Sequence, residues 1–221
     1  MQNYWEERGN LGLVPAFFKT FFDILGAPAR FFQAPWPKPG FWHPLLFGVT
    51  CQTIGTFFQY LYSILFDSLG AMLFTFFGAS STEVLMQTGV SIIIAAIIIV
   101  FAPLGAVVNL FLFTFIYHVC LMIVGGNKKD MEATFRAICY SQGPSLFLVV
   151  PVIGAVIAFV WQLVLMIIGI KEIHGTTYPK AILAIIIPLM VCCSLLVMGI
   201  AGIIFLIAYL QTSTSSPPLR I

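Results

Sequence analysis

Charge is what this sequence has least of: only 8% of its 221 residues are Asp, Glu, Lys or Arg, against about 25% in an ordinary soluble domain. Hydrophobic residues make up 60% of the chain. A soluble fold of this size has too much surface to cover with so few charges. The composition therefore excludes a soluble enzyme, a disordered chain and a nucleic-acid-binding module, and it predicts an all-α, multi-span transmembrane helix bundle.

The motifs of enzymes and of disulfide frameworks are also missing. The sequence has no phosphate-binding glycine loop, no nucleophile elbow and no H-E-x-x-H. Its five cysteines lie in apolar segments without a C-x-x-C pair, which is typical of small packing residues. We therefore expect a protein that is not an enzyme, with no catalytic residue, no cofactor and no metal.

Long stretches without Asp, Glu, Lys or Arg predict the spans. They cover residues 44–65, 85–126, 137–170 and 181–219, and a spanning helix needs about 20 apolar residues. Pro103 predicts a kink in the second stretch, and the turn residues from Pro151 to Gly154 divide the third. Five spans follow, at residues 44–66, 89–124, 133–150, 152–170 and 180–210, with a four-span alternative in which the third stretch stays whole.

The positive charges favour the five-span alternative. With a cytoplasmic N-terminus, five spans place nine of the ten Lys and Arg residues on the cytoplasmic side, and four spans place eight there. We expect a multi-pass protein of the cell (inner) membrane with its C-terminus outside. Three regions follow: a cytoplasmic segment 1–43, a membrane domain 44–210 and a disordered tail 211–221. Segment 67–88 is left open between a loop and a partly membrane-embedded stretch.

Residues 15–33 predict an amphipathic helix too short to span. Phe17, Phe18, Phe21, Phe22 and Leu25 recur on one helical face, with polar residues opposite. This pattern favours a helix lying in the membrane interface. The alternative is a helix packed against the cytoplasmic ends of the spans.

Polar residues inside the spans are the candidate sites, because burying them in lipid is costly. On the first span, Gly48, Gln52, Gly55 and Gln59 share one face. This face forms either a helix–helix seam, where glycines permit close approach, or a path for a polar solute. Asn109, His118 and Gln162 are the corresponding polar residues on later spans.

Three histidines are weak candidates for a metal site. In the five-span arrangement His43, His118 and His174 lie toward the same side of the membrane, but their spacing matches no known ligand motif. The alternative is that His118 forms a hydrogen bond with a neighbouring helix, for example with Tyr140 or Gln142.

An ordered series of short motifs resembles a known family. The series is Trp42-His43-Pro44-Leu45-Leu46-Phe47, His118, Gly125-Gly126, Ala133-Thr134-Phe135-Arg136, Tyr140, Pro144, Pro151, Gly154, Trp161, Gly169-Ile170-Lys171-Glu172-Ile173-His174-Gly175, Lys180-Ala181 and Pro188. Over residues 17–206 it resembles the Yip-type (Ypt/Rab-interacting) membrane proteins, in their prokaryotic branch. The resemblance implies a five-span helical domain with a cytoplasmic N-terminus.

The same resemblance limits what is expected of partners. The family's eukaryotic members bind prenylated Rab-class GTPases, but their Asp-Leu-Tyr-Gly signature and long N-terminal region are not found here. Small GTPase binding is therefore not carried over. We expect a non-enzymatic membrane scaffold or adaptor whose partners are the lipid bilayer and other membrane proteins or a second copy. The alternative is a small-solute or ion transporter that uses the polar face of the first span.

Overall fold

The computed structural model describes residues 4–9, 11–36, 39–78 and 80–215, and within these ranges the chain is helical without strands. The elements are α1 (Leu13–Gly26), α2 (Pro28–Gln33), α3 (Trp42–Phe76), α4 (Ser81–Ile123), α5 (Met131–Tyr140), the 3-10 helix η1 (Gly143–Val149), α6 (Ile153–His174) and α7 (Tyr178–Ser215). The predicted all-α membrane bundle is confirmed.

Among the described residues, four helices are long and apolar enough to cross a membrane: α3, residues 86–123 of α4, α6, and residues 178–207 of α7. The predicted span 133–150 is instead two short pieces, α5 and η1, because the chain leaves the α-helix after Tyr140 and Pro144 lies at the start of η1. Proline has no backbone N–H and disfavours helix in the residue before it. One of the five predicted segments is therefore not a continuous helix.

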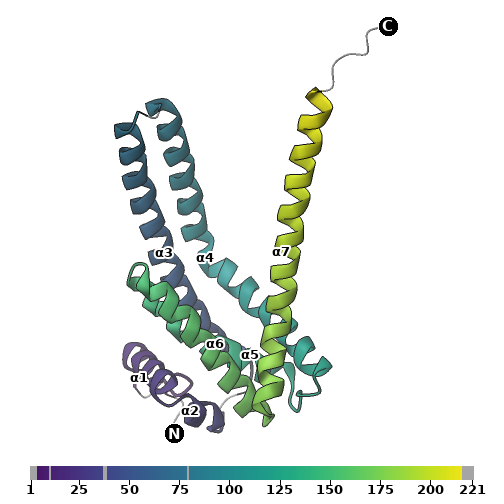
Figure 1. The fold of residues 1–221 in the computed structure, drawn as a ribbon. Helices are drawn as coiled ribbons and strands as arrows, with labels where there is room; N and C mark the ends of the chain where they lie inside the picture. Colours follow the sequence, from purple (N-terminus) through teal and green to yellow (C-terminus); the bar gives the residue numbers. More distant parts are fainter. Residues whose placement is uncertain (1–3, 10, 37–38, 79, 216–221) are drawn as a thin grey trace.

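The chain still reverses direction as five segments require. α3 rises and α4 returns, α5 and η1 rise part of the way, α6 returns, and α7 rises again (Figure 1). The last turn of α7 lies at the opposite end of the molecule from α1 and α2 (Figure 1). The open segment 67–88 is a helical hairpin, since α3 continues to Phe76 and α4 begins at Ser81. α7 continues through Ser215, into the segment predicted as a tail, whose residues 216–221 lie outside the described residues.

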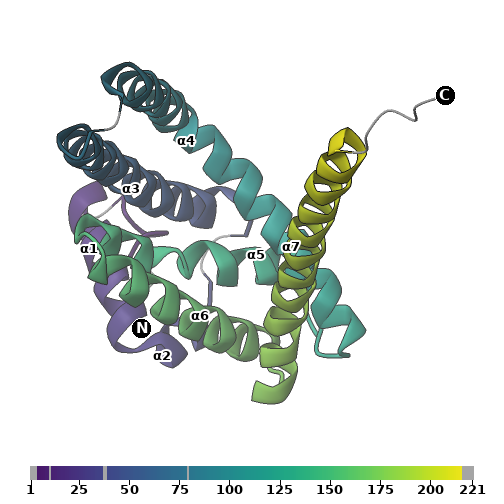
Figure 2. The ribbon, with the colours of Figure 1, turned by 45° about the horizontal axis from the view of Figure 1, so that its top comes forward.

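The helices pack tightly at one end and diverge at the other (Figures 1 and 2). We call the packed end the base; it contains α1, α2, α5, η1, α6 and residues 42–62, 106–123 and 178–188. The first arm is the hairpin of residues 63–76 and 81–105, and the second arm is residues 189–215 of α7. The largest fully buried side chains, such as Tyr140, Phe47 and Leu165, all belong to the base.

Glycines on α3 and α6 let the α5–η1 segment enter the middle of the base. A side chain added at Gly55 would come within 2.6 Å of the Ser145 carbonyl oxygen, and one added at Gly154 would overlap the Phe147 carbonyl. Only hydrogen fits at either position, which is how small residues bring backbones into contact in membrane bundles. The polar face predicted on the first span thus includes a seam, and its partner is the broken segment rather than a long helix.

The N-terminal amphipathic helix forms, but it also packs on protein. In α1, Phe21 and Ile24 are buried against the base, whereas Phe18 and Phe22 are 49% and 65% exposed. α2 buries Phe31 and Phe32 against α6 and Tyr140. The two sequence alternatives therefore describe two faces of one segment: one face covers the base, and the other presents phenylalanines outward. That the outer face lies in the membrane interface stays a prediction.

Candidate functional site

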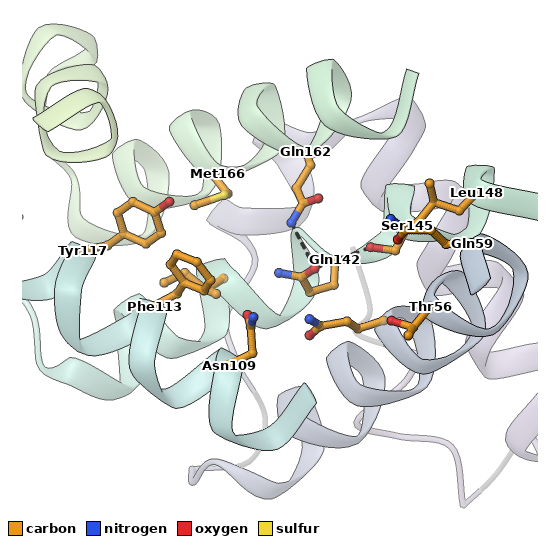
Figure 3. A pocket seen from close by; sticks show the side chains of 12 residues that line it. Thr56, Gln59, Asn109, Phe113, Tyr117, Gln142, Ser145, Leu148, Gln162 and Met166 are labelled. Atoms are coloured by element: carbon orange, nitrogen blue, oxygen red, sulfur yellow. Dashed lines mark hydrogen bonds between the residues drawn. The ribbon is translucent and has the colours of Figure 1, made fainter. Parts of the chain in front are cut away.

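A polar cavity of about 280 Å³ lies where α3, α4, α6 and the α5–η1 segment meet (Figure 3). Amides and hydroxyls make up its polar lining. The residues around it are Gln52, Thr56, Gln59, Asn109, Phe113, Tyr117, Ile138, Gln142, Ser145, Leu148, Gln162 and Met166. We call this space the polar cavity. It offers hydrogen-bond donors and acceptors without a formal charge.

Helical spacing brings these side chains to one place. Gln52, Thr56 and Gln59 follow the i, i+4, i+7 pattern of one face of α3. Asn109, Phe113 and Tyr117 follow an i, i+4, i+8 pattern along one face of α4. In Figure 3, Gln142 lies between Gln162 of α6 and the side chains of α3 and α4. The structure thus gathers four of the sequence candidates, Gln52, Gln59, Asn109 and Gln162, around one cavity.

The hydrogen-bonding groups that line the polar cavity do not all have partners. Gln162 Nε2 donates to Gln142 Oε1 over 3.0 Å, and Ser145 Oγ donates to the same oxygen over 3.5 Å. The Gln52 Oε1 atom is buried and has no partner among the described residues. A buried acceptor without a donor costs about 1–3 kcal/mol, so this position favours a donor group or water in the cavity.

The other two candidates on the α3 face, Gly48 and Gly55, do not line the cavity. A side chain at Gly48 would lie 3.1 Å from the Cys139 carbonyl oxygen of α5, and Gly55 faces η1. The face is therefore divided by residue type. Its glycines form the contact with the α5–η1 segment, and its glutamines point into the polar cavity.

Two of the three histidines meet through one hydroxyl. Thr134 Oγ1 lies 2.8 Å from His118 Nδ1 and 2.9 Å from His174 Nε2, and the two imidazole rings are 6.3 Å apart. Asn127 Nδ2 lies 3.4 Å from His118 Nε2. His118 thus bonds Thr134 of α5, rather than the Tyr140 or Gln142 suggested by the sequence. The arrangement joins α4, α5 and α6 at their shared end.

His43 is engaged elsewhere in the base. Its Nδ1 lies 2.8 Å from Arg8 Nη1, and its backbone carbonyl accepts a hydrogen bond from the Trp5 indole over 2.7 Å. In the part of the chain that the structure describes, His, Cys, Asp and Glu side chains form no group of three that could hold a metal ion. His43 therefore anchors the N-terminal turn.

A buried ion pair was missed by the sequence analysis. Glu6 is fully buried and pairs with Arg136 of α5, and Tyr140 Oη donates to the same Glu6 oxygen over 3.1 Å. Arg136 also bonds Glu132 over 3.0 Å and lies 5.1 Å from the ring centre of Trp36. These contacts tie residues 4–9 into the base. A lone arginine in an apolar segment was the available signal, but nothing in the local pattern identifies Glu6 as its partner.

Comparison with known proteins assigns the chain to a family. Neither the curated proteins nor the solved structures give a match. A family model, described as the Yip1 domain, matches residues 22–200. That range begins inside α1 and ends inside α7, so it includes the polar cavity, the two histidines at Thr134 and the α5–η1 segment. The chain is an integral membrane protein that belongs to the Yip1 domain family.

Proposed function

We propose that this Yip1-domain chain is a non-enzymatic membrane scaffold or adaptor, whose second arm packs against helices of other membrane proteins or of a second copy. One observation carries the proposal. A stripe of small residues runs along one face of α7. In the first half of the helix the stripe packs against the base, and in the second half it is uncovered. Small residues let membrane helices approach closely and pack.

The stripe is continuous along one face. Ala181, Ala184, Cys192, Gly199 and Gly202 fall within an arc of about 80° at 3.6 residues per turn. Ala181 and Ala184 are fully buried in the base, Cys192 is exposed, and a side chain added at Gly199 or Gly202 meets nothing within 4 Å. The uncovered half therefore supports packing against a helix from outside the chain.

A photoreactive amino acid in α7 tests the scaffold proposal in native membranes. Leu195 lies on the stripe face and Val197 on the opposite face, and the two are 61% and 66% exposed. We expect discrete protein adducts from position 195 and none from position 197. Gly199→Leu should weaken the adducts from position 195, and mass spectrometry should identify the partners. Equal adducts from both positions, or adducts with lipid alone, would contradict the proposal.

We propose the orientation that the charges favour, with the base cytoplasmic and the second arm leading outward across the cell (inner) membrane. Lys128 Nζ bonds the Gly175 carbonyl and Lys180 Nζ bonds the Gly125 carbonyl, both over 2.8 Å. These cations gather at the base, which fits the excess of Lys and Arg in cytoplasmic loops. Reporter fusions after Gly126, Gly175 and Arg220 test this, and a cytoplasmic reporter after Arg220 would contradict it.

The partners we propose are lipid and membrane proteins, without nucleic acid. Binding of a small GTPase is not part of the proposal. A second candidate function is the passage of a small uncharged solute, which the polar cavity favours. A single Cys at position 52, in a chain without its five native cysteines, separates the two. Slow reaction with a membrane-impermeant thiol reagent supports the scaffold, and rapid reaction at positions 52 and 59 supports passage.

A further inference from the structure

A second cavity, of about 310 Å³, adjoins the polar cavity on the side of α7. Its lining is almost entirely hydrocarbon and includes Ile116 of α4, Phe159 and Leu163 of α6, and Ile185 and Leu189 of α7. We call this cavity the apolar groove. Phe159 and Leu189 are 58% and 43% exposed at its edge, so the groove is bordered by surface that faces the hydrocarbon of a bilayer.

The two cavities share a wall. Phe113, Tyr117, Gln162 and Met166 line both of them, so side chains alone separate the polar space from the apolar one. In Figure 3, Phe113, Tyr117 and Met166 stand together at one end of the polar cavity. Met166 belongs to this wall, and the flexible Met side chain adapts to the shape of a ligand. Together the volumes fall within the roughly 300–1,000 Å³ typical of ligand sites.

The chemistry of the polar half selects the headgroup. Its lining amides, hydroxyls and phenol donate and accept hydrogen bonds, and neither a cation nor a carboxylate is among its lining residues. A phosphate would lack a counter-charge there, and so would an ammonium group, each at a large desolvation cost. The buried Gln52 Oε1 has no partner among the described residues, and a hydroxyl group supplies the missing donor.

We propose that the polar cavity and the apolar groove form one binding site for an uncharged acylglycerol. Its hydroxyl headgroup lies among Gln52, Asn109 and Gln162, and one acyl chain lies along the groove between α6 and α7. Of the stripe residues, Cys192 also lines the apolar groove. The residues that bind the headgroup lie outside the stripe, so the acylglycerol proposal does not rest on the scaffold proposal. Lipid reaches it laterally, past Phe159 and Leu189, without passing through water.

Photolabelling with a monoacylglycerol tests the site in the full-length chain. The probe carries a diazirine in its acyl chain, and the protein is held in phosphatidylcholine nanodiscs. We expect saturable labelling that maps to the groove residues of α6 and α7. Unlabelled monooleoylglycerol should compete. Lysophosphatidic acid and oleylamine, with the same chain but charged headgroups, should compete at least tenfold less well.

Variants in the polar half separate headgroup binding from chain binding. Gln162→Leu and Asn109→Leu should each lower labelling at least fivefold. Val160→Leu, a control on the exposed face of α6, should leave it unchanged. Thermal unfolding in the same nanodiscs identifies a variant that fails to fold. Gln162 bonds Gln142, in the turn between α5 and η1, so Asn109→Leu replaces Gln162→Leu if the latter fails to fold. The variants therefore report on the headgroup even if one of them is unstable.

Three results would overturn the proposal. The first is labelling that does not saturate. The second is equal competition by lysophosphatidic acid or by methyl oleate, because the site would then recognise the chain without the hydroxyl groups. The third is unchanged labelling in a folded Asn109→Leu protein, because the polar half would then take no part in binding.

Discussion

The base and the second arm share one apolar helix, α7, yet α7 is packed only where it belongs to the base. Residues 178–188 of α7 bury Ala181, Ala184 and Ile185, whereas hydrophobic residues from Leu189 to Tyr209 are exposed along the same helix. Hydrophobicity therefore does not decide which part of a membrane helix packs, since lipid is as apolar as a neighbouring helix. Close approach at glycine and buried polar contacts make the difference. The base has both, and the second arm has an uncovered stripe without them.

The polar contacts of the base bring together distant parts of the chain. Glu6 and Arg136 are 130 residues apart, and Thr134 connects α4 with α6. Each contact joins α5 to a part of the chain that is distant in the sequence: residues 4–9, α4 or α6. The base is thus fixed around α5 and η1.

The largest effect is expected from breaking the buried ion pair. Glu6→Ala removes the fully buried carboxylate of the Arg136 pair and leaves Glu132 as the carboxylate that still pairs with this guanidinium. Removing one partner of a buried pair costs up to about 3–5 kcal/mol. The melting temperature of the purified protein should fall strongly. Glu7→Ala, at the neighbouring partly exposed residue, is the matched control. Equal melting temperatures for the two variants would show that residues 4–9 are not part of the base.

A smaller effect is expected where backbones touch. Gly55→Leu places a side chain against the Ser145 carbonyl, which lies 2.6 Å from the first added carbon; overpacking typically costs about 1–3 kcal/mol. The yield of folded protein should drop. Gly70→Leu, in the first arm and with nothing within 4 Å, should leave the yield unchanged. Loss of yield in both variants would remove the distinction between base and arm.

Next comes the hydroxyl between the two histidines. Thr134→Val keeps the shape of the side chain but removes the contacts to His118 and His174, and each lost hydrogen bond is worth about 1 kcal/mol. Thr134→Ser keeps the hydroxyl and should retain most of the stability. The comparison is made by thermal unfolding. A Thr134→Val protein as stable as the Thr134→Ser protein would mean that these contacts contribute nothing.

The smallest effect on stability is expected in the second arm. Gly202→Leu adds a side chain in open space, and surface substitutions usually change stability by less than about 0.5 kcal/mol. The purified protein should unfold at the same temperature as the parent. The same variant should lose protein adducts from position 195 in native membranes, because the stripe is then blocked. A clear drop in the melting temperature would indicate that the stripe packs within the chain.

The charge pattern predicts the helices well and their ends poorly. Charge-free stretches locate α3, α4, α6 and α7. The predicted turn at Pro151 lies two residues before α6 begins, at Ile153. The prediction ended the first span before Asp67, whereas α3 continues to Phe76. A carboxylate on an exposed helical face does not end a helix. The break between α5 and η1 falls just before Pro144, and a charge count does not register a proline.

The sequence predicts which residues belong to the candidate site better than it predicts how they are arranged. Helical periodicity identifies Gln52 and Gln59 as one face, and their polarity marks Asn109 and Gln162. That all four meet at one cavity depends on Gln142, which lies in the turn between α5 and η1. Glu6 could not be matched to Arg136, because no local period relates residues so far apart.

The central claim is that the chain does not cover the stripe of its own second arm. Spin labels at Ile93 of α4 and Leu195 of α7, which are 62% and 61% exposed, measure it directly in nanodiscs. The account predicts no dipolar contact of the kind that packed helices give, because α7 diverges from α3 and α4 (Figures 1 and 2). Strong dipolar broadening, typical of helix axes about 8–10 Å apart, would contradict it, since the arms would then close on each other and leave no surface for a partner.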